Sequence, residues 1–256
     1  MALDNAVYTG LFGNYESLNE VSCERLPSTR YVCFTDDRNL RSRSWEIVVT
    51  QSDSNPVMAS RRVKFFGHQF FRKGARTLYI DNTVSLQMDG SIILSDWLES
   101  NNLAFMKHYS RGNLRNEFFV CSVFGMDEQK SLFNHFKAYC KLFPGIMGEE
   151  VYWGGMIAKV NCDETDRLMT AWYEEYCKFS KRDQLSLKVA LRREQVAHRL
   201  ITESNVQSVW HQWPNHNNRK FAQKGASYGV YKRKVYYLVN ALKYGFRYFL
   251  PIRGNY

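Results

Sequence analysis

The sequence lacks an apolar run of the roughly 20 residues that a membrane-spanning helix needs. Residues 1–5 also lack the basic and apolar regions of a secretory signal. We therefore expect a cytoplasmic protein that neither crosses a membrane nor is exported.

Cysteine pairs at metal-binding or redox spacing are absent as well. The six cysteines are scattered, and no two of them show the C-x-x-C spacing of zinc ribbons and redox motifs. We expect them to be reduced thiols with structural roles, as is usual in the cytosol.

Acidic residues are missing from the end of the chain, where the last one is Glu203. Nine lysines and arginines follow it, and they account for nine of the ten net positive charges. This asymmetry divides the sequence into a nearly neutral body, residues 1–203, and a basic, aromatic segment, residues 204–256.

The body has the composition of a folded globular domain, because 45% of the whole chain is hydrophobic and 23% is charged. Short β-rich runs alternate with helical patterns, which predicts an α/β fold with a mostly parallel sheet covered on both faces. The predicted strands are residues 6–12, 31–35, 45–50, 77–80, 103–106 and 152–160. The predicted helices are residues 57–71, 92–100, 114–142 with a break near Gly125, 164–179 and 185–191.

One polar turn follows the apolar strand at residues 77–80. Ligands of open α/β sheets bind at the carboxyl ends of strands, and Asp81 stands at such an end. Its carboxylate either binds a divalent cation that neutralises a diphosphate, or caps a turn. A second carboxylate two residues later would complete a cation site, but this position is Thr83, so both interpretations stay open.

A basic cluster occupies the predicted helix at residues 57–71. Arg61, Arg62 and Lys64, with His68, either bind the diphosphate of a ligand or form a solvated helix face.

Two further groups have functional and structural interpretations. His108, Arg111 and Glu117 either contact substrate hydroxyls or include a structural His–Glu pair, and Asp183 either contacts substrate or is a helix N-cap. The glycines at 154 and 155 indicate either close approach of the backbone to a ligand or another chain, or a β-bulge.

The basic segment carries an apolar stripe at helical spacing: Val235, Leu238, Val239, Leu242, Phe246 and Phe249. The stripe either binds an anionic membrane surface or packs on the body as a last helix. Basic residues interleaved with Tyr and Trp also suit nucleic acid, but no recognised nucleic-acid motif accompanies them, and we expect no such partner.

Seven ordered segments of residues 6–191 resemble the mucilage-related, glycosyltransferase-like family. They are Tyr8-Thr-Gly-Leu-Phe-Gly-Asn-Tyr15, Cys33-Phe-Thr-Asp36, Ser60-Arg-Arg-Val-Lys64 with His68, Tyr79-Ile-Asp-Asn-Thr83, His108-x-x-Arg111 with Glu117, Tyr152-Trp-Gly-Gly155 and Ser180-Lys-Arg-Asp-Gln-Leu-Ser186. The resemblance implies a GT-A-like, Rossmann-like fold similar to that of retaining glycosyltransferases.

The resemblance also implies site roles, which concern mainly the donor. Donor contacts would come from Tyr8 and Thr9 at the base, Arg61 and Lys64 at the diphosphate, Asp81 and Thr83 at the positions of an Asp-x-Asp motif, and Gly154, Gly155 and Gln184 at the sugar. His108 and Arg111 would contact acceptor or sugar, and Asp183 or Glu117 would be the catalytic carboxylate.

Thr83 departs from the Asp-x-Asp pattern and leaves three cases open. A divalent cation, Mn²⁺ or Mg²⁺, is held by Asp81 and another residue such as His211 or His216; or Lys64 and Arg61 replace the metal; or catalysis is lost.

We therefore expect a glycosyltransferase domain at residues 1–203 and a membrane-associating segment at residues 204–256. It would move a sugar from a nucleotide-sugar, a UDP-sugar first of all, to a glycan or lipid-linked acceptor of surface polysaccharide or lipopolysaccharide. Its place would be the cytoplasmic face of a membrane. The alternatives are an inactive nucleotide-sugar- or glycan-binding homologue and a nucleic-acid-binding protein.

Overall fold

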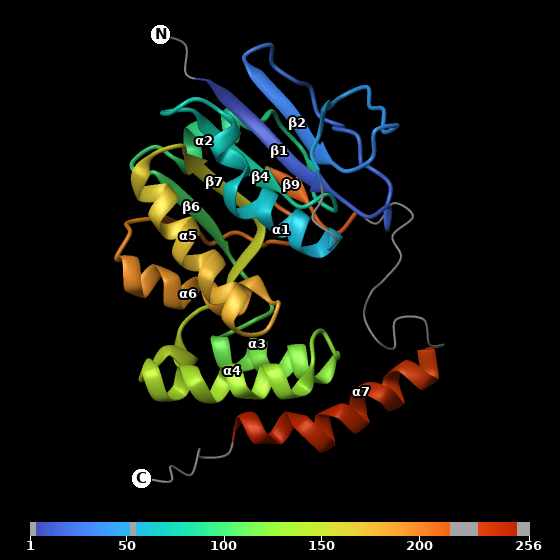
Figure 1. Ribbon diagram of the computed structural model, residues 1–256, viewed down its shortest axis with the longest axis vertical. Helices are drawn as coiled ribbons and strands as arrows, with labels where there is room; N and C mark the ends of the chain where they lie inside the picture. Colours follow the sequence, from blue (N-terminus) through green and yellow to red (C-terminus); the bar gives the residue numbers. More distant parts are fainter. Residues whose placement is uncertain (1–3, 52–54, 216–229, 250–256) are drawn as a thin grey trace. The chain divides into compact units, whose positions relative to one another are not determined.

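The computed structural model describes residues 4–51, 55–215 and 230–249 (Figure 1). Their contacts divide the chain into two compact units. The first contains Met1–Tyr109, Trp153–Tyr173 and Glu194–Lys220, and the second contains Ser110–Tyr152, Glu174–Arg193 and Phe221–Tyr256. Each unit is described separately below.

A seven-stranded sheet forms the centre of the first unit. Its strand order is β3 (Glu46–Val49), β2 (Thr29–Thr35), β1 (Asn5–Leu11), β4 (Arg76–Ile80), β7 (Tyr152–Val160), β6 (Leu103–Lys107) and β8 (Arg199–Ile201). β1 runs parallel to β2 and β4, β2 to β3 and β6 to β8, whereas β7 is antiparallel to β4. The α/β, GT-A-like expectation is thus confirmed, and all six predicted strands are present.

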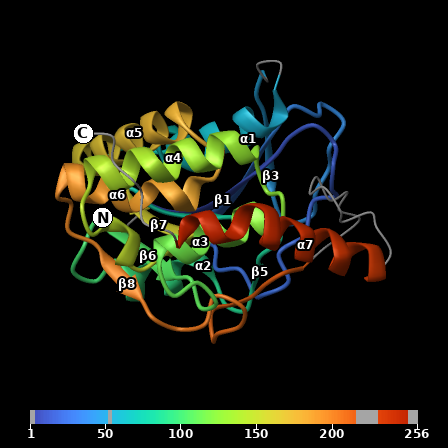
Figure 2. The same cartoon turned by 90° about the horizontal axis from the view of Figure 1, so that it is seen from below.

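Helices cover both faces of this sheet, as two glycines show. Val7 and Tyr8 are consecutive in β1, so their side chains point to opposite faces. A Cβ added at Gly67, which begins η1 (Gly67–Phe70) after α1 (Pro56–Phe66), would overlap the Tyr8 ring. One added at Gly90, the first residue of α2 (Gly90–Trp97), would overlap Val7. α1 and α2 therefore lie on opposite sides of β1 (Figure 2).

Capping residues set where these helices begin. The Asn55 side chain accepts hydrogen bonds from the backbone N–H groups of Val57 and Met58 at the start of α1. Asp89 accepts one from Ser91 N at the start of α2 and also binds the hydroxyls of Thr29 and Tyr31. Asp89 thus holds the start of α2 against β2.

Two further elements complete the first unit. β5 (Ser85–Leu86) and β9 (His211–Gln212) form a small antiparallel ribbon that brings a late segment of the chain to the end of β4. α5 (Asp163–Lys178) begins in the first unit and ends in the second. Its residues Leu168, Trp172 and Tyr176 are fully buried.

The second unit is helical. It contains α3 (Leu114–Val123), α4 (Gln129–Leu142), η2 (Ile146–Gly148), α6 (Asp183–Glu194), α7 (Val230–Tyr244) and η3 (Gly245–Tyr248). Phe118, Phe136 and Tyr248 are buried in its core. The predicted break between α3 and α4 is confirmed, because Gly125 has a φ of +61°, a value that favours glycine.

α7 confirms a helix in the basic segment, but its apolar stripe is exposed to solvent. Among the described stripe residues, Phe249 contacts the body, since its ring lies 5.5 Å from that of Phe119 on α3, and the others are exposed. No described helix is both long and apolar enough to cross a membrane.

Candidate functional site

The turn after β4 presents a carboxylate at the end of a buried strand. The backbone N–H of Asp81 donates to the Gly155 carbonyl on β7 over 2.8 Å, and Val84 N donates to the Asp81 carbonyl over 2.9 Å. The Asp81 side chain is 33% exposed, and the Tyr79 hydroxyl donates to its Oδ1 over 2.7 Å. Main-chain bonds thus hold the turn while the carboxylate stays accessible to a ligand.

Lys64 on α1 reaches the same carboxylate. Its side chain is only 2% exposed, and its Nζ lies 3.8 Å from Asp81 Oδ1 and 5.4 Å from the centre of the Tyr79 ring. Half-buried Arg61 precedes it by three residues, a spacing that places both cations on neighbouring positions of the helix surface. α1 thus brings Lys64 to the end of β4, and its contact with a donor diphosphate stays a prediction.

Lys159 is a second buried lysine here, and sequence reasoning missed it. It lies on β7, and its Nζ donates to the Lys64 carbonyl over 2.8 Å and lies 5.3 Å from the centre of the Tyr8 ring. Burial, and then the neighbouring Lys64 charge, lower the pKa of Lys159 well below its ordinary value. In the sequence, Lys159 could have been noticed as a lone lysine inside an apolar strand. In the structure, its hydrogen bond holds the backbone of α1 at Lys64.

The loop after β1 is tied to the Asp81 turn through Asn82. The N–H of Asn19 donates to Asn82 Oδ1 over 2.9 Å, and the side-chain amide of Asn19 donates to the Asn82 carbonyl over 2.6 Å. In return, Asn82 Nδ2 donates to the Ser17 carbonyl over 2.9 Å. The ends of β1 and β4 therefore form one continuous hydrogen-bonded surface.

A cavity of about 290 Å³ lies beside this surface, at the carboxyl ends of β1 and β2. Ser17 and Leu18 form one wall, and Glu16, Asp36 and Asp37 supply carboxylates. Both Asp36 carboxylate oxygens accept from Gly13 N, at 3.1 and 3.2 Å, which orients this side chain. The cavity suits a polar ligand that donates hydrogen bonds.

Thr83 is engaged by residues from late in the chain. Its hydroxyl accepts from the Trp213 indole over 3.1 Å, and its carbonyl accepts from Asn215 N over 2.7 Å. Asn19 Nδ2 donates to the Asn215 carbonyl over 3.1 Å. Thr83 stands where an Asp-x-Asp motif would have its second carboxylate. In this chain it instead anchors Trp213 and Asn215.

His211 is also fully buried, and both of its ring nitrogens have partners. Nε2 lies 3.0 Å from the Asn205 carbonyl, which can only accept, so Nε2 carries the proton. Nδ1 then accepts from the Ser208 hydroxyl over 2.8 Å. Burial lowers the pKa of His211, and its ring stacks on Trp153.

His211 in this state presents no lone pair to a metal, and the case in which it completes a cation site with Asp81 stays a prediction. His216 lies outside the described residues. Nor do the described ranges contain any group of three His, Cys, Asp or Glu side chains that could hold a metal ion. Asp81 is thus a single ligand, and these side chains alone do not form a complete metal site.

Tyr8 and Thr9, expected at the base of the nucleotide, are core residues. Tyr8 is fully buried against Phe34 and Tyr79, and Thr9 is 1% exposed. Neither lines the cavity at the strand ends, and their contact with a base stays a prediction.

The two glycines of β7 have a packing role. Both are buried, and a Cβ added at Gly155 would overlap the indole ring of Trp153. β7 pairs with β4 in regular register from Val160 to Met156, so the regular pairing reaches the residue next to Gly155. The close neighbour of Gly155 is Trp153 of the same strand, and contacts of Gly154 and Gly155 with donor sugar stay predictions.

The remaining carboxylate candidates belong to the second unit. Glu117 is 1% exposed and accepts from Arg111 Nε over 2.8 Å, with Arg182 Nη2 at 3.9 Å. Asp183 and Gln184 are buried at the start of α6, and the Asp183 carbonyl accepts from the Ser186 hydroxyl over 3.1 Å.

His108 lies in the first unit, buried just after β6. It therefore belongs to a different unit from Arg111 and Glu117. The roles predicted for His108, Arg111, Glu117, Asp183 and Gln184 stay predictions.

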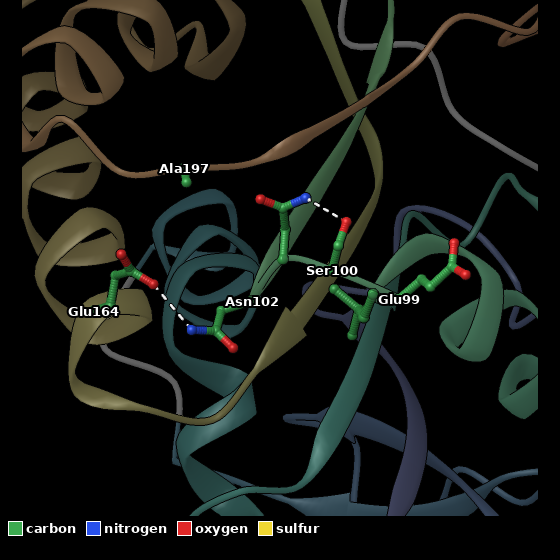
Figure 3. A pocket seen from close by; sticks show the side chains of 7 residues that line it. Glu99, Ser100, Asn102, Glu164 and Ala197 are labelled. Carbon is green, nitrogen blue, oxygen red and sulfur yellow. Dashed lines mark hydrogen bonds between the residues drawn. The ribbon is translucent and has the colours of Figure 1, made fainter.

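A second cavity of the first unit lies at the other end of the strands, near the start of β4. Asn102, just before β6, accepts through its carbonyl from Val160 N, and Val160 pairs with Arg76 at the start of β4, far from Asp81. The cavity is polar, and the Asn102 side chain donates to Glu164 Oε2 over 3.0 Å (Figure 3). It has no part in the site at the end of β4.

Comparison with known families identifies the class of domain. The sequence model of the TOD1/MUCI70, glycosyltransferase-like domain matches residues 5–207, which include the sheet, the Asp81 turn, Lys64 and the cavity. Among curated proteins, none matches the chain. With most of its length matched, the chain belongs to the TOD1/MUCI70 glycosyltransferase-like family, and its activity class at the coarse level is that of a glycosyltransferase.

Proposed function

We propose that the protein transfers a sugar from a nucleotide-sugar donor to a glycan or lipid-linked acceptor. The observation that carries the proposal is the buried Lys64 ammonium beside the accessible Asp81 carboxylate, at a strand end that adjoins a cavity. Family membership supplies the class of reaction, and this pair supplies a place for the donor diphosphate.

The nucleoside would occupy the cavity at the ends of β1 and β2. Ribose hydroxyls and the ring N–H of uracil are hydrogen-bond donors, which the carboxylates of Glu16, Asp36 and Asp37 can accept. The volume of about 290 Å³ is near the lower limit for small-molecule sites. A UDP-sugar is therefore the donor we propose first.

The diphosphate would lie over Lys64 and Arg61. Departure of the nucleoside diphosphate concentrates negative charge on its phosphate oxygens, and a cation already fixed by the fold stabilises that charge without reorganisation. Lys159 holds the backbone of Lys64 in place and acts as a positioning residue. This arrangement favours stabilisation of the leaving group by side-chain cations.

A divalent cation, Mn²⁺ or Mg²⁺, is part of the proposal through Asp81. When bound it would supply Lewis-acid stabilisation of phosphate oxygens. In the described residues Asp81 is its one candidate protein ligand at the turn, and every other step proposed here uses side chains of the chain itself.

The acceptor side of the reaction is proposed from the resemblance of residues 180–186 to the family's segment. We propose Asp183 and Gln184 as contacts of the transferred sugar, and Asp183 ahead of Glu117 as proton acceptor. Glu117 is only 1% exposed and already pairs with Arg111, whose Nε donates to it over 2.8 Å.

A second candidate function is binding of a nucleotide-sugar without transfer. It is favoured by Thr83, whose hydroxyl accepts from Trp213 instead of offering a carboxylate. Both functions require donor binding, but only the transferase turns the donor over.

A thermal-shift panel of UDP-, GDP-, ADP- and CMP-sugars, with and without Mn²⁺, tests the donor site, because a ligand of the folded state raises the melting temperature. We expect a UDP-sugar to stabilise the wild type and not Lys64→Met, while the matched variant of exposed Lys130, Lys130→Met, behaves as wild type. Absence of any shift at saturating concentration would overturn the proposal, and a shift without donor hydrolysis or transfer would favour the binding homologue.

A further inference from the structure

The apolar stripe of α7 and η3 faces solvent. Its members are Val235, Leu238, Val239, Leu242, Phe246 and Phe249, with exposed fractions between 42% for Val235 and 63% for Phe246. Val235, Leu238, Val239 and Leu242 share one face of α7. Phe246 lies in η3, and Phe249 follows η3 with its ring 5.5 Å from that of Phe119. Patches of exposed apolar side chains mark interaction sites.

The opposite face of the helix is the one that packs. α7 lies along α3, where Asn240 Nδ2 donates to the Val123 carbonyl over 3.0 Å and Tyr237 contacts the Phe124 ring at 4.5 Å between centroids (Figure 2). Tyr248 of η3 is fully buried and lies 6.2 Å from the Phe118 ring. The helix therefore packs within its own unit through polar and aromatic groups, and most of the stripe remains exposed to solvent.

Positive charge borders the stripe on both sides. At 100° per residue, Lys232 and Lys243 lie on one side of the stripe and Lys234 on the other, and all three are exposed. No acidic residue occurs after Glu203. The face is thus apolar along its centre and cationic along its margins, which is the pattern of helices that lie in the plane of a membrane interface.

Two other occupants fit this face less well. A second copy packed stripe to stripe would bring the lysines of both chains together without compensating acids, which costs electrostatic free energy. A nucleic acid would satisfy the lysines but leave six apolar side chains in water. An anionic bilayer satisfies both, because acyl chains take up the apolar residues and headgroups pair with lysines whose stems follow the apolar surface.

We propose that this face of α7 binds the anionic surface of a lipid bilayer, with the helix parallel to the membrane plane and the stripe inserted at the headgroup boundary. The residues of this face belong to the second unit and those of the Asp81 site to the first, so no residue is shared and membrane binding and donor binding can be tested independently.

Co-sedimentation of the full chain with vesicles tests the proposal. We expect binding to phosphatidylcholine vesicles that contain phosphatidylglycerol and weak binding to phosphatidylcholine alone. The double variant Leu238→Glu and Leu242→Glu should lose roughly tenfold or more in affinity for the anionic vesicles. The triple variant Lys232→Gln, Lys234→Gln and Lys243→Gln should lose on the order of a hundredfold.

The matched control is Val209→Glu, which puts the same charge on an apolar residue that is 68% exposed outside the stripe. It should bind vesicles as the wild type does, and all variants should keep their melting temperature because the changed side chains are exposed. Unchanged vesicle binding in the stripe variant would overturn the proposal. So would a wild-type dimer that Leu242→Glu dissociates, or lysine-dependent binding to oligonucleotides but not to vesicles.

Discussion

The Lys64 ammonium lies 3.8 Å from Oδ1 of Asp81, so a nearly fully buried cation faces a carboxylate that remains one-third exposed. The distance exceeds that of a hydrogen bond, and Tyr79 already donates to the same oxygen. Lys64 is therefore held near Asp81 by opposite charge and not by a hydrogen bond to this oxygen. A phosphate entering at the strand end would meet a cation that the fold has already positioned.

Lys64→Met should reduce donor turnover by about 10² to 10³, the cost typical of removing one preorganised group that stabilises developing charge. Lys64→Arg should recover part of it, since it restores charge with a different shape. Steady-state kinetics with the donor identified by thermal shift would measure both. Equal turnover in Lys64→Met and wild type would contradict the role of Lys64.

Asp81→Ala should abolish donor turnover and leave the fold intact. The turn is held by the main-chain N–H of Asp81 and its carbonyl, which the substitution keeps. We expect a melting temperature within a few degrees of wild type, as for partly exposed positions. Wild-type turnover in this variant would rule out the proposed role of the carboxylate.

His211→Phe should lower stability without changing any dependence of turnover on Mn²⁺. The new ring can still stack on Trp153, but the bonds to Asn205 and Ser208 are lost, at about 1–3 kcal/mol for the buried groups left unpaired. Urea denaturation and an Mn²⁺ titration of activity would test this. Loss of Mn²⁺ response specifically in His211→Phe would show that the histidine turns toward a metal.

Gly155→Ala should destabilise the protein by about 1–3 kcal/mol, as overpacking does, because its methyl group meets the Trp153 ring. Gly148→Ala is the matched control, since no atom lies within 4 Å of the position of its added Cβ. Urea denaturation of both variants gives the comparison. Equal stability of the two would show that Trp153 moves aside without cost.

Stability should fall as the pH drops below about 6.5, partly because of His135. Burial lowers the pKa of His135 to about 3 in the folded state from 6.5, so between these values the unfolded chain binds a proton that the folded chain does not. The free energy of unfolding then loses up to about 1.4 kcal/mol per pH unit through this group. Urea denaturation from pH 7 to pH 4 should show a shallower slope for His135→Phe, and an unchanged slope would contradict the assignment.

Much of the fold and part of the site could be read from local sequence. The apolar runs at residues 6–12 and 77–80 became β1 and β4, Gly125 separated α3 from α4, and Asp81 stands at a strand end. These features depend on side-chain period and on backbone conformations near in sequence, which neighbouring residues largely determine.

The tertiary structure alone decided which distant groups meet. Lys159 under Lys64, Asn19 on Asn82 and Trp213 on Thr83 join segments far apart in the chain, and no local pattern specifies those partners. The stripe of α7 makes the same point, because its period predicted a helix but not which face would pack. Asn240 and Tyr248 fit against α3, so the apolar residues were left in solvent. The spacing of apolar residues predicts the secondary structure of one element. Which of its faces is buried depends on the complementary surface of another element.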